Sequence, residues 1–383
     1  MRARKKCMVI FVMIFALLIS LSITTTAVDV EPKIEGSSLI PLGLSFVEQN
    51  IDSLVKIDEL TCIAQRRNKT FLPQHYSVKQ LVDFNGYIYY VVEFDPVGYA
   101  IYDNQFANIL EFNADAISPY YEYIDNIIYA GAGEYYVKSA SVDSCDVYRH
   151  TVQNSEIHMD DATKAYYQKL STSISSAVES DAIQKMNESS NLILDASSDN
   201  YASLRKYTSI TDRDTTGFNT DGNCGYISGS LIVWYHYDVL GWTEFVPGGV
   251  YSEDLVTAIQ GDHPNNTMGP GLQTALSDWS YNHGAVDGWQ ESLPALYDVL
   301  PSGSKIFKLI KENRPVALLG KVPSSTELDT YAVNGTTSHV ITVTAVEKLS
   351  SSYAYFAHFG WEKKYNDVYI TDSVITKGSI VYY

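Results

Sequence analysis

The sequence has few cysteines and few positive charges for its length. Its 383 residues include four cysteines, and 27 Lys and Arg stand against 45 Asp and Glu, a net charge of −18. So few cysteines exclude a disulfide-rich scaffold, in which bridges replace a large core. The excess of negative charge predicts no nucleic-acid partner and no binding to anionic membranes, because both repel an acidic surface.

The motifs of common metal sites are also missing. No CxxC or HExxH motif occurs, and His263 and His283 lack the spacing of metal ligands. The sequence therefore predicts no metal site and no other cofactor. There is no internal repeat and no low-complexity tract. With 45% hydrophobic and 19% charged residues, the composition is that of a chain with a packed core.

Only the N-terminus carries a long apolar run. Basic residues at positions 2 to 6 precede a stretch from Met8 to Leu21 that is apolar apart from one serine, and small residues continue to Ala27. This order is typical of a signal peptide, so we expect residues 1–27 to be cleaved and the protein to be secreted, with no membrane partner afterwards. The alternative is an uncleaved anchor, but the run is shorter than the roughly 20 residues that span a bilayer. Cleavage removes four positive charges and moves the net charge from −18 to −22.

Cleavage would also remove Cys7 and leave Cys62, Cys145 and Cys224. Cys62 and Cys145 could pair with each other or remain buried thiols. An odd thiol in an exported protein is unusual. Cys224 could be a core residue, half of a disulfide or a nucleophile.

The first half of the chain has the pattern of a β-rich domain. Residues 38–150 consist of short runs of aromatic and β-branched residues separated by Gly, Pro, Asn and Asp, which predicts antiparallel strands. The clearest of these runs are 86–94, 98–102 and 127–137. Residues 156–186 lack Pro and Gly and predict a helix. The Ser- and Asn-rich stretch 187–200 predicts a linker.

From about residue 207, expected helices precede expected strands. Ile227, Leu231 and Trp234 recur at helical spacing after Cys224, which predicts an amphipathic helix. Further helices are expected at 271–280 and 303–312, and strands at 340–346, 353–359 and 368–370.

Cys224 and His339 are the candidates for nucleophilic chemistry. Cys224 stands at the start of its helix, where unpaired N–H groups and a partial positive charge favour a thiolate. His339 opens the strand at 340–346, where its ring could face a cleft as a general base. The alternative is a core cysteine and an ordinary loop histidine.

Several segments resemble one known family. GNCGYISGSLIVWYHYD, around Cys224, resembles the active-site helix of the streptopain-like family of papain-like cysteine proteases. SHVITVTAVEK resembles the family's histidine strand, and AHFGWEKKYNDVYI resembles the following strand, which in the family carries Asn-Trp-Gly-Trp. Upstream, GYAIYDNQFANILEFNADAISPYY is similar to a strand pair of the family's prodomain. The resemblance touches both halves of the chain in the family's order.

The resemblance implies an α+β fold with two domains. Residues 207–383 would form a papain-like catalytic domain, with a helical part that carries Cys224 and an antiparallel sheet part that carries His339. Residues 28–195 would form an inhibitory prodomain, mostly β and partly helical, and residues 196–206 a linker with the processing site. The implied protein is a secreted cysteine endopeptidase made as a zymogen. Its partners would be a protein or peptide substrate and its own prodomain.

The third catalytic position departs from the family pattern. His358 stands where the family has the Asn that orients the catalytic histidine, and Trp361 matches the second Trp of that motif. His358 could still hydrogen-bond to His339 in a pH-dependent way, or it could be a non-catalytic replacement. Asn366 and Asp367 are more distant candidates for the same role.

The expected oxyanion donor is missing as well. The family places a Gln a few residues before the nucleophile, but no Gln lies between Gln184 and Cys224. Asn219 and Asn223 are the nearest amides, and Asn219 is the candidate oxyanion donor. The alternative is that Asn219 only forms an Asx turn.

These departures keep two other functions open. The chain could be a catalytically inactive, secreted binding protein on a protease-like scaffold. It could also keep the Cys–His chemistry with another acceptor, as an amidase or transpeptidase.

Overall fold

The structure, a computed structural model, falls into two compact units, residues 1–39 and 40–383. All described residues belong to the second: 40–142, 145–152, 156–187, 199–218, 223–261, 263, 269–283, 295–299, 301–320, 339–361, 363–374 and 377–382. The predicted signal peptide lies outside them, as does most of the Ser- and Asn-rich stretch 187–200. Residues 199–206 of the predicted linker 196–206 are described, and they contain a strand, Tyr201–Ser203. None of the helices in these ranges is long and apolar enough to cross a membrane.

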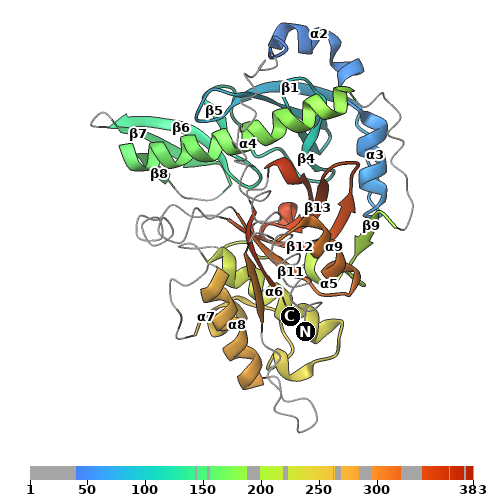
Figure 1. The fold of residues 1–383 in the computed structure, drawn as a ribbon, viewed down its shortest axis with the longest axis vertical. Helices are drawn as coiled ribbons and strands as arrows, with labels where there is room; N and C mark the ends of the chain where they lie inside the picture. Colours follow the sequence, from blue (N-terminus) through green and yellow to red (C-terminus); the bar gives the residue numbers. More distant parts are fainter. Residues whose placement is uncertain are drawn as a thin grey trace, which may run out of the picture. The chain divides into compact units, whose positions relative to one another are not determined.

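Residues 40–187, here called the N-terminal region, are rich in strands (Figure 1). Its elements are α2 (Leu44–Leu54), α3 (Ile57–Gln65), β1 (His75–Val82), β2 (Ile88–Asp95), β3 (Tyr99–Tyr102), β4 (Ile109–Asn113), β5 (Ile127–Tyr129), β6 (Tyr135–Val142), β7 (Cys145–His150), β8 (Glu156–Met159) and α4 (Asp161–Asn187). The predictions of strands at 86–94 and 98–102 are confirmed. The run 127–137 is a hairpin of two strands, and the predicted helix at 156–186 begins only after the short strand β8.

Residues 199–383, here called the C-terminal region, contain most of the helices and the second group of strands. The elements are β9 (Tyr201–Ser203), α5 (Thr208–Thr211), α6 (Cys224–Asp238), η1 (Thr243–Phe245), α7 (Glu253–Gln260), α8 (Gly269–His283), β10 (Leu296–Val299), α9 (Gly303–Lys311), β11 (Val316–Gly320), β12 (Val340–Lys348), β13 (Tyr353–His358), η2 (Lys363–Tyr365), β14 (Val368–Thr371), η3 (Asp372–Val374) and β15 (Lys377–Tyr382). The predicted helices at 271–280 and 303–312 are α8 and α9, and the three predicted strands are β12, β13 and β14.

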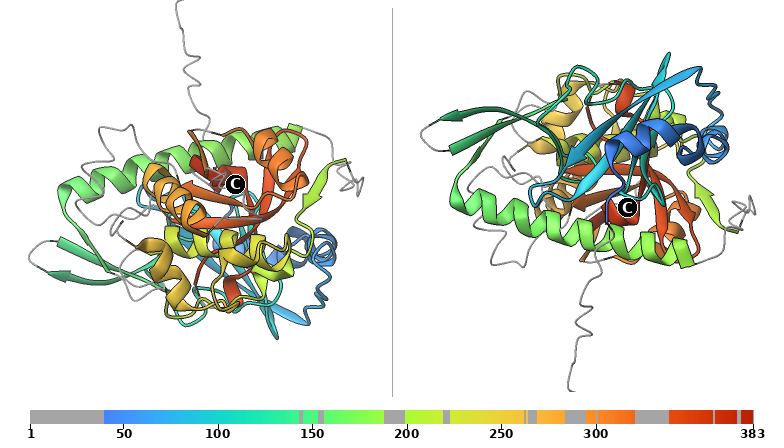
Figure 2. Two further views of the ribbon diagram at one scale, coloured as in Figure 1. Left: turned by 90° about the horizontal axis from the view of Figure 1, so that it is seen from below. Right: turned by 90° about the horizontal axis from the view of Figure 1, so that it is seen from above.

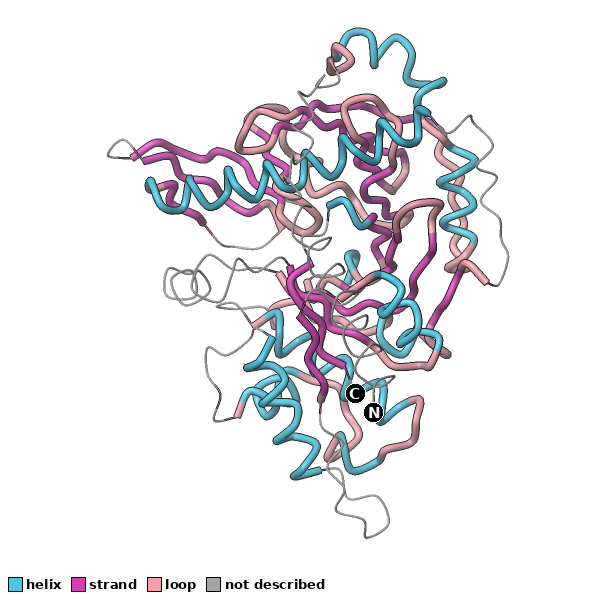
Figure 3. The backbone as a smooth tube through the Cα atoms, in the orientation of Figure 1, coloured by secondary structure: helices cyan, strands magenta, loops and turns pink. Residues whose placement is uncertain are grey.

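The strands of both regions form one sheet, and this corrects the predicted fold class. The 15-stranded sheet runs β10-β15-β11-β12-β13-β14-β4-β3-β2-β1-β5-β6-β7-β8, with β9 paired to β12. It is mainly antiparallel, with β1 and β5 parallel. Figure 3 follows the strands from one region into the other.

The expected papain-like catalytic domain behind a separate prodomain is therefore wrong, although the chain is an α+β protein. The two regions join where β4 pairs with β14, through Phe112 with Tyr369 and Glu111 with Ile370. Every residue of both strands is buried. Such apolar strands leave costly unpaired backbone groups at an edge, so pairing them extends the sheet across the expected domain boundary.

Helix α6 is enclosed on all sides, which contradicts its prediction as an amphipathic helix. Every residue from Cys224 to His236 is buried. Ser228 hydrogen-bonds to Thr342 of β12 at 2.7 Å. On α8, Leu276 lies where a Cβ on Gly229 would come within 3.1 Å. A helix that is apolar or small all round belongs to the interior.

Helix α4 is the long helix that packs against the hairpin strands of the N-terminal region (Figure 2). Its Tyr166 and Tyr167 share a small core with Ile128, Ala130 and Tyr136. This contact matters for the site because the tip of the hairpin between β5 and β6 reaches the C-terminal region.

Candidate functional site

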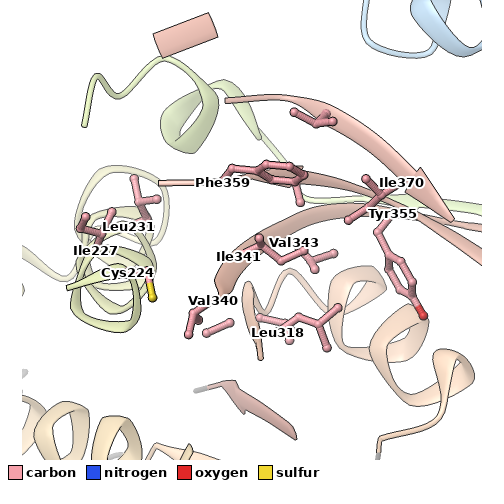
Figure 4. Packing of buried hydrophobic residues seen from close by; sticks show 14 of the residues in the cluster. Cys224, Ile227, Leu231, Leu318, Val340, Ile341, Val343, Tyr355, Phe359 and Ile370 are labelled. Atoms are coloured by element: carbon pink, nitrogen blue, oxygen red, sulfur yellow. The ribbon is translucent and has the colours of Figure 1, made fainter. Parts of the chain in front are cut away.

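Cys224 begins α6 and is buried, with 4% of its surface exposed. Figure 4 shows its sulfur turned toward Val340, the first residue of β12. Burial raises the pKa of the Cys224 thiol to about 11, the backbone N–H groups of Val340 and Gly225 act to lower it, and the negative charge of Glu134 raises it. The helix N-terminus was expected to favour the thiolate, but here burial outweighs that effect.

His339 immediately precedes β12, the strand that contacts α6. Side chains alternate along a strand, and Thr342 contacts α6 through Ser228, so Val340 also lies on the α6 face of β12. The ring of His339 lies on Trp361, with centroids 4.6 Å apart and planes tilted by 33°. Its Nε2 is buried and has no hydrogen-bond partner among the described residues.

The surroundings of His339 keep its ring neutral. Burial lowers the pKa of His339 to about 3, nearby His150 lowers it further, and a hydrogen bond with the Phe359 backbone acts in the opposite direction. In this state the imidazole is a poor proton acceptor. Cys224 and His339 are thus both uncharged at neutral pH, and neither has the ionisation state of an active thiolate–imidazolium pair.

The hairpin tip, residues 130–134 between β5 and β6, lies directly on the His339 ring. Gly133 has a φ of +83°, and a Cβ there would stand 3.1 Å from Cδ2 of His339 and 3.2 Å from Cη2 of Trp361. Only glycine combines this backbone conformation with such a close approach. The tip therefore covers one face of the His339 ring.

A second histidine holds the tip from the side of the N-terminal region. Nε2 of His150 is 3.0 Å from the Gly133 carbonyl oxygen. Nδ1 of His150 accepts a hydrogen bond from the Val152 N–H at 3.2 Å, so the ring proton is on Nε2 and is donated to Gly133. Burial lowers the pKa of His150 to about 4. The His150 ring also packs against Trp361, with centroids 5.3 Å apart.

Other contacts hold the tip from both regions. The Ala132 N–H donates to the Val374 carbonyl at 3.2 Å. A Cβ on Gly131 would lie 2.8 Å from Ile174 of α4. The Glu134 carboxyl accepts a hydrogen bond from the Tyr136 hydroxyl. Burial raises the pKa of Glu134 to about 7, so this residue titrates near neutrality beside the candidate site.

The structure places His358 away from His339. His358 is fully buried in β13 and pairs in register with Thr342, on the α6 face of the sheet. Its Nδ1 accepts from the Gly360 N–H at 2.8 Å, so Nε2 donates to the Arg213 carbonyl at 3.1 Å. Burial lowers its pKa to about 4. Both ring nitrogens of His358 therefore form hydrogen bonds to the backbone, and neither is left to bond to His339.

The remaining predicted residues divide between the site and its surroundings. Trp361 is buried and stacks on His339, and its carbonyl accepts from Thr215 Oγ1 at 2.5 Å. Asn223 is the N-cap residue of α6 without a side-chain cap; its carbonyl accepts from the Ile227 N–H at 3.0 Å. Asn219 lies outside the described residues.

Asn366 belongs to the support of the segment before Cys224. Its Nδ2 donates to the Thr211 carbonyl at 3.0 Å and to the Arg213 carbonyl at 2.7 Å. Together with His358 it fixes the backbone that leads toward the candidate nucleophile. Sequence reasoning treated it only as a distant substitute for the missing Asn of the family motif.

The most informative residues that sequence reasoning missed are Gly133, Glu134 and His150. The pair of glycines in AGAGE, residues 130–134, is a sign of a tight hairpin tip, but no local pattern tells which distant side chain the tip contacts. The three described cysteines are free thiols, so the possible pairing of Cys62 with Cys145 is not present. Within the described ranges, no cluster of His, Cys, Asp and Glu could hold a metal ion.

Comparison with known proteins adds no family assignment: no family model matches the chain, and no curated protein matches it significantly.

Proposed function

We propose that the protein is a secreted cysteine endopeptidase made as a zymogen, with Cys224 as the nucleophile and His339 as the general base. The observation that carries this proposal is the position of the hairpin tip. Gly133 packs on His339 and Trp361, and neighbouring Glu134 raises the pKa of Cys224. One short segment of the N-terminal region thus acts on both members of the pair, as a latent form requires.

Removal of the hairpin tip should shift the pKa values of Cys224 and His339 toward those of an active thiolate–imidazolium pair. Burial and Glu134 both raise the pKa of Cys224, so exposing the thiol and removing the carboxyl lower it. Burial is also the main cause of the lowered pKa of His339, so hydration raises it. The freed imidazole can then take the thiol proton.

The reaction proposed for the open form is acyl transfer in two steps. The Cys224 sulfur attacks a peptide carbonyl carbon, and the C–N bond breaks as His339 gives its proton to the leaving amine. Water, deprotonated by His339, then attacks the thioester and releases the acid and the thiol. The Cys224 N–H at the start of α6 is the first donor to the oxyanion.

The test is labelling by a peptidyl epoxide, which alkylates an activated cysteine. We expect no labelling of the intact chain, and labelling at Cys224 once the chain is cut between residues 187 and 199 and the N-terminal region is removed. Cys224→Ala is the control. No labelling of the freed C-terminal region would overturn the peptidase proposal in favour of a non-catalytic binding protein. Labelling accompanied by transfer of peptides to amines, without hydrolysis, would favour a transpeptidase.

A further inference from the structure

Arg67, just after α3, inserts its side chain from the N-terminal region into the C-terminal region. It is 3% exposed. Its Nε donates to both carboxylate oxygens of Asp367, at 3.0 and 3.1 Å, and its Nη2 lies 2.8 Å from Oδ1 of the same residue. A planar guanidinium that binds a carboxylate through two nitrogens forms a strong ion pair, which requires a specific relative orientation of the two groups.

The rest of the guanidinium is enclosed by what we call the Arg67 socket, formed by Tyr207, Thr344, Phe356 and Asp367. The guanidinium carbon lies 3.5 Å from the ring centroid of Tyr207 and 4.8 Å from that of Phe356. Nη2 donates to Thr344 Oγ1 at 3.1 Å. The Tyr207 hydroxyl in turn donates to the Arg67 carbonyl at 3.0 Å. Every residue of the socket belongs to the C-terminal region.

The positive charges of Arg67 and Lys69 stabilise the negative charge of the buried Asp367. Burial raises the pKa of Asp367, but Arg67 and Lys69 outweigh that effect and hold the pKa below its usual value. Lys69, also from the N-terminal region, bridges Asp367 at 3.2 Å and Asp115 at 2.9 Å. If Arg67 is removed, a buried carboxylate loses its main partner, and such an uncompensated charge is costly.

The ion pair has apolar packing on one side and a polar cavity on another. Beside the socket lies a cavity of about 490 Å³ whose walls come from both regions. Polar side chains line much of it, including Lys69, Asp115, Thr208 and Asn366. The two regions also share an apolar core, in which Phe71 and Phe112 lie with Phe356 of the socket, and Arg67 adds a buried ion pair to this interface. The contact is also separate from the hairpin tip, which arises from β5 and β6.

We infer that Arg67 is the anchor that keeps the N-terminal region bound to the C-terminal region after the chain between them is cut. This inference rests on the proposed function in that the bound N-terminal region would keep the peptidase latent until it leaves. Cleavage alone then does not activate the protein. Activation requires the ion pair to open together with the β4–β14 pairing, and the Arg67 contact lengthens the delay between cleavage and activity.

The test measures association and needs no activity. A site for a sequence-specific protease is placed between residues 187 and 199 of the Cys224→Ala chain, and dissociation of the two fragments is followed after the cut. We expect the cut parent to remain a complex. Arg67→Met should speed dissociation by about 30-fold or more, because removing one partner of a buried ion pair acts mainly on the dissociation rate. Arg149→Met is the matched control, since Arg149 is exposed and its side chain hydrogen-bonds at 3.3 Å to Tyr123 of its own region.

A complex of Arg67→Met that lasts as long as the parent complex would overturn the anchor. Circular dichroism of the uncut chains checks that the variant folds. If Arg67→Met does not fold, Arg67→Lys takes its place, because it keeps the charge and loses the planar fork. Faster dissociation of that variant supports the anchor, and an unchanged rate overturns it. Epoxide labelling of chains that retain Cys224 tests the peptidase separately, so the two proposals can fail independently.

Discussion

Gly133 and His339 approach so closely that a Cβ on the glycine would lie 3.1 Å from Cδ2 of the histidine. The glycine belongs to the hairpin tip and the histidine to the end of β12, so the contact joins the two regions at the candidate site. It leaves no room for a side chain on the tip and no free face on that side of the imidazole. A substitution at Gly133 is therefore expected to disturb the contact between the hairpin tip and His339.

Gly133→Ala should loosen the tip. The substitution forces alanine into a φ of +83° and against His339, whereas Gly86→Ala imposes nearly the same φ, +82°, with nothing within 4 Å. The control should lower the free energy of unfolding by about 1–2 kcal/mol through the backbone alone. Gly133→Ala should cost about 1 kcal/mol or more beyond that, because the contact is overpacked. Urea unfolding of both variants measures the difference. Equal decreases in the free energy of unfolding would mean that the hairpin tip can move enough to accommodate a Cβ at residue 133.

The docking of the tip should weaken in acid. Burial lowers the pKa of His150 to about 4 and that of His339 to about 3, below the usual value of about 6.5. The released state therefore binds more protons than the docked state. Docking is at full strength for these groups above about pH 6.5 and is lost as the pH falls toward the docked-state values. Glu134, with a pKa raised to about 7, acts in the opposite direction, so one carboxyl offsets part of the effect of two histidines.

Hydrogen exchange of the tip amides, corrected for intrinsic rates, measures this effect. We expect about tenfold less protection at pH 4.5 than at pH 6.5. His150→Gln keeps an N–H donor for the Gly133 carbonyl but does not titrate in this range, so it should reduce the pH dependence. Identical pH profiles for the two proteins would show that His150 has no part in it.

The sequence predicted the local elements better than their arrangement. The alternating strands near His339 and the helix after Cys224 have strong local periodicity, and the structure confirms that both exist. The stripe of Ile227, Leu231 and Trp234 predicts one buried face on α6. The structure buries a second face, which Ser228 and Gly229 form, and a search for apolar residues does not detect these two. Small residues allow close contact precisely because they add no side-chain bulk, so a hydrophobicity pattern misses them.

The features that the sequence did not predict depend on contacts between residues far apart in the chain. The pairing of β4 with β14 joins strands far apart in the chain, and no local signal in ILEFN or VYIT specifies the partner. For the same reason the sequence placed Cys224 and His339 at the starts of their elements but did not predict the tip that covers His339. His358 is predicted from its position in a motif, and only the structure shows that both of its ring nitrogens bond to the backbone.

His358→Asn should destabilise the fold. The shorter side chain cannot reach both the Arg213 carbonyl and the Gly360 N–H, which His358 bonds at 3.1 and 2.8 Å in a fully buried position. Loss of buried hydrogen bonds predicts a decrease of about 1–3 kcal/mol in the free energy of unfolding at pH 7. His158→Asn, at an exposed position of β8, is the matched control and should change stability little.

The effect of His358→Asn should also depend on pH. The pKa of His358 is lowered to about 4, so its stabilising effect is complete above about pH 6.5 and is lost as the pH falls toward 4. The difference in unfolding free energy between the parent and the variant should therefore shrink between pH 7 and pH 5. A constant difference would mean that neutral His358 does not support the fold in this way.

Gly229→Ala tests the packing that holds the helix of Cys224. A Cβ at Gly229 would lie 3.1 Å from Leu276 Cδ2 and 3.2 Å from Leu272 Cδ1, and the glycine has ordinary helical geometry. Alanine favours the helix by about 1 kcal/mol, but overpacking costs about 1–3 kcal/mol, so we expect a net loss of stability.

A double-mutant cycle with Leu276→Ala separates these two effects. Leu276→Ala alone should cost about 2–5 kcal/mol, as truncation of a buried leucine does. In that background the contact with Leu276 is gone and the contact with Leu272 remains, so Gly229→Ala should cost less than in the parent, with a coupling of about 1 kcal/mol or more. Additive losses would contradict the close contact between α6 and α8. They would also mean that the start of α6, and with it Cys224, is not positioned by this packing.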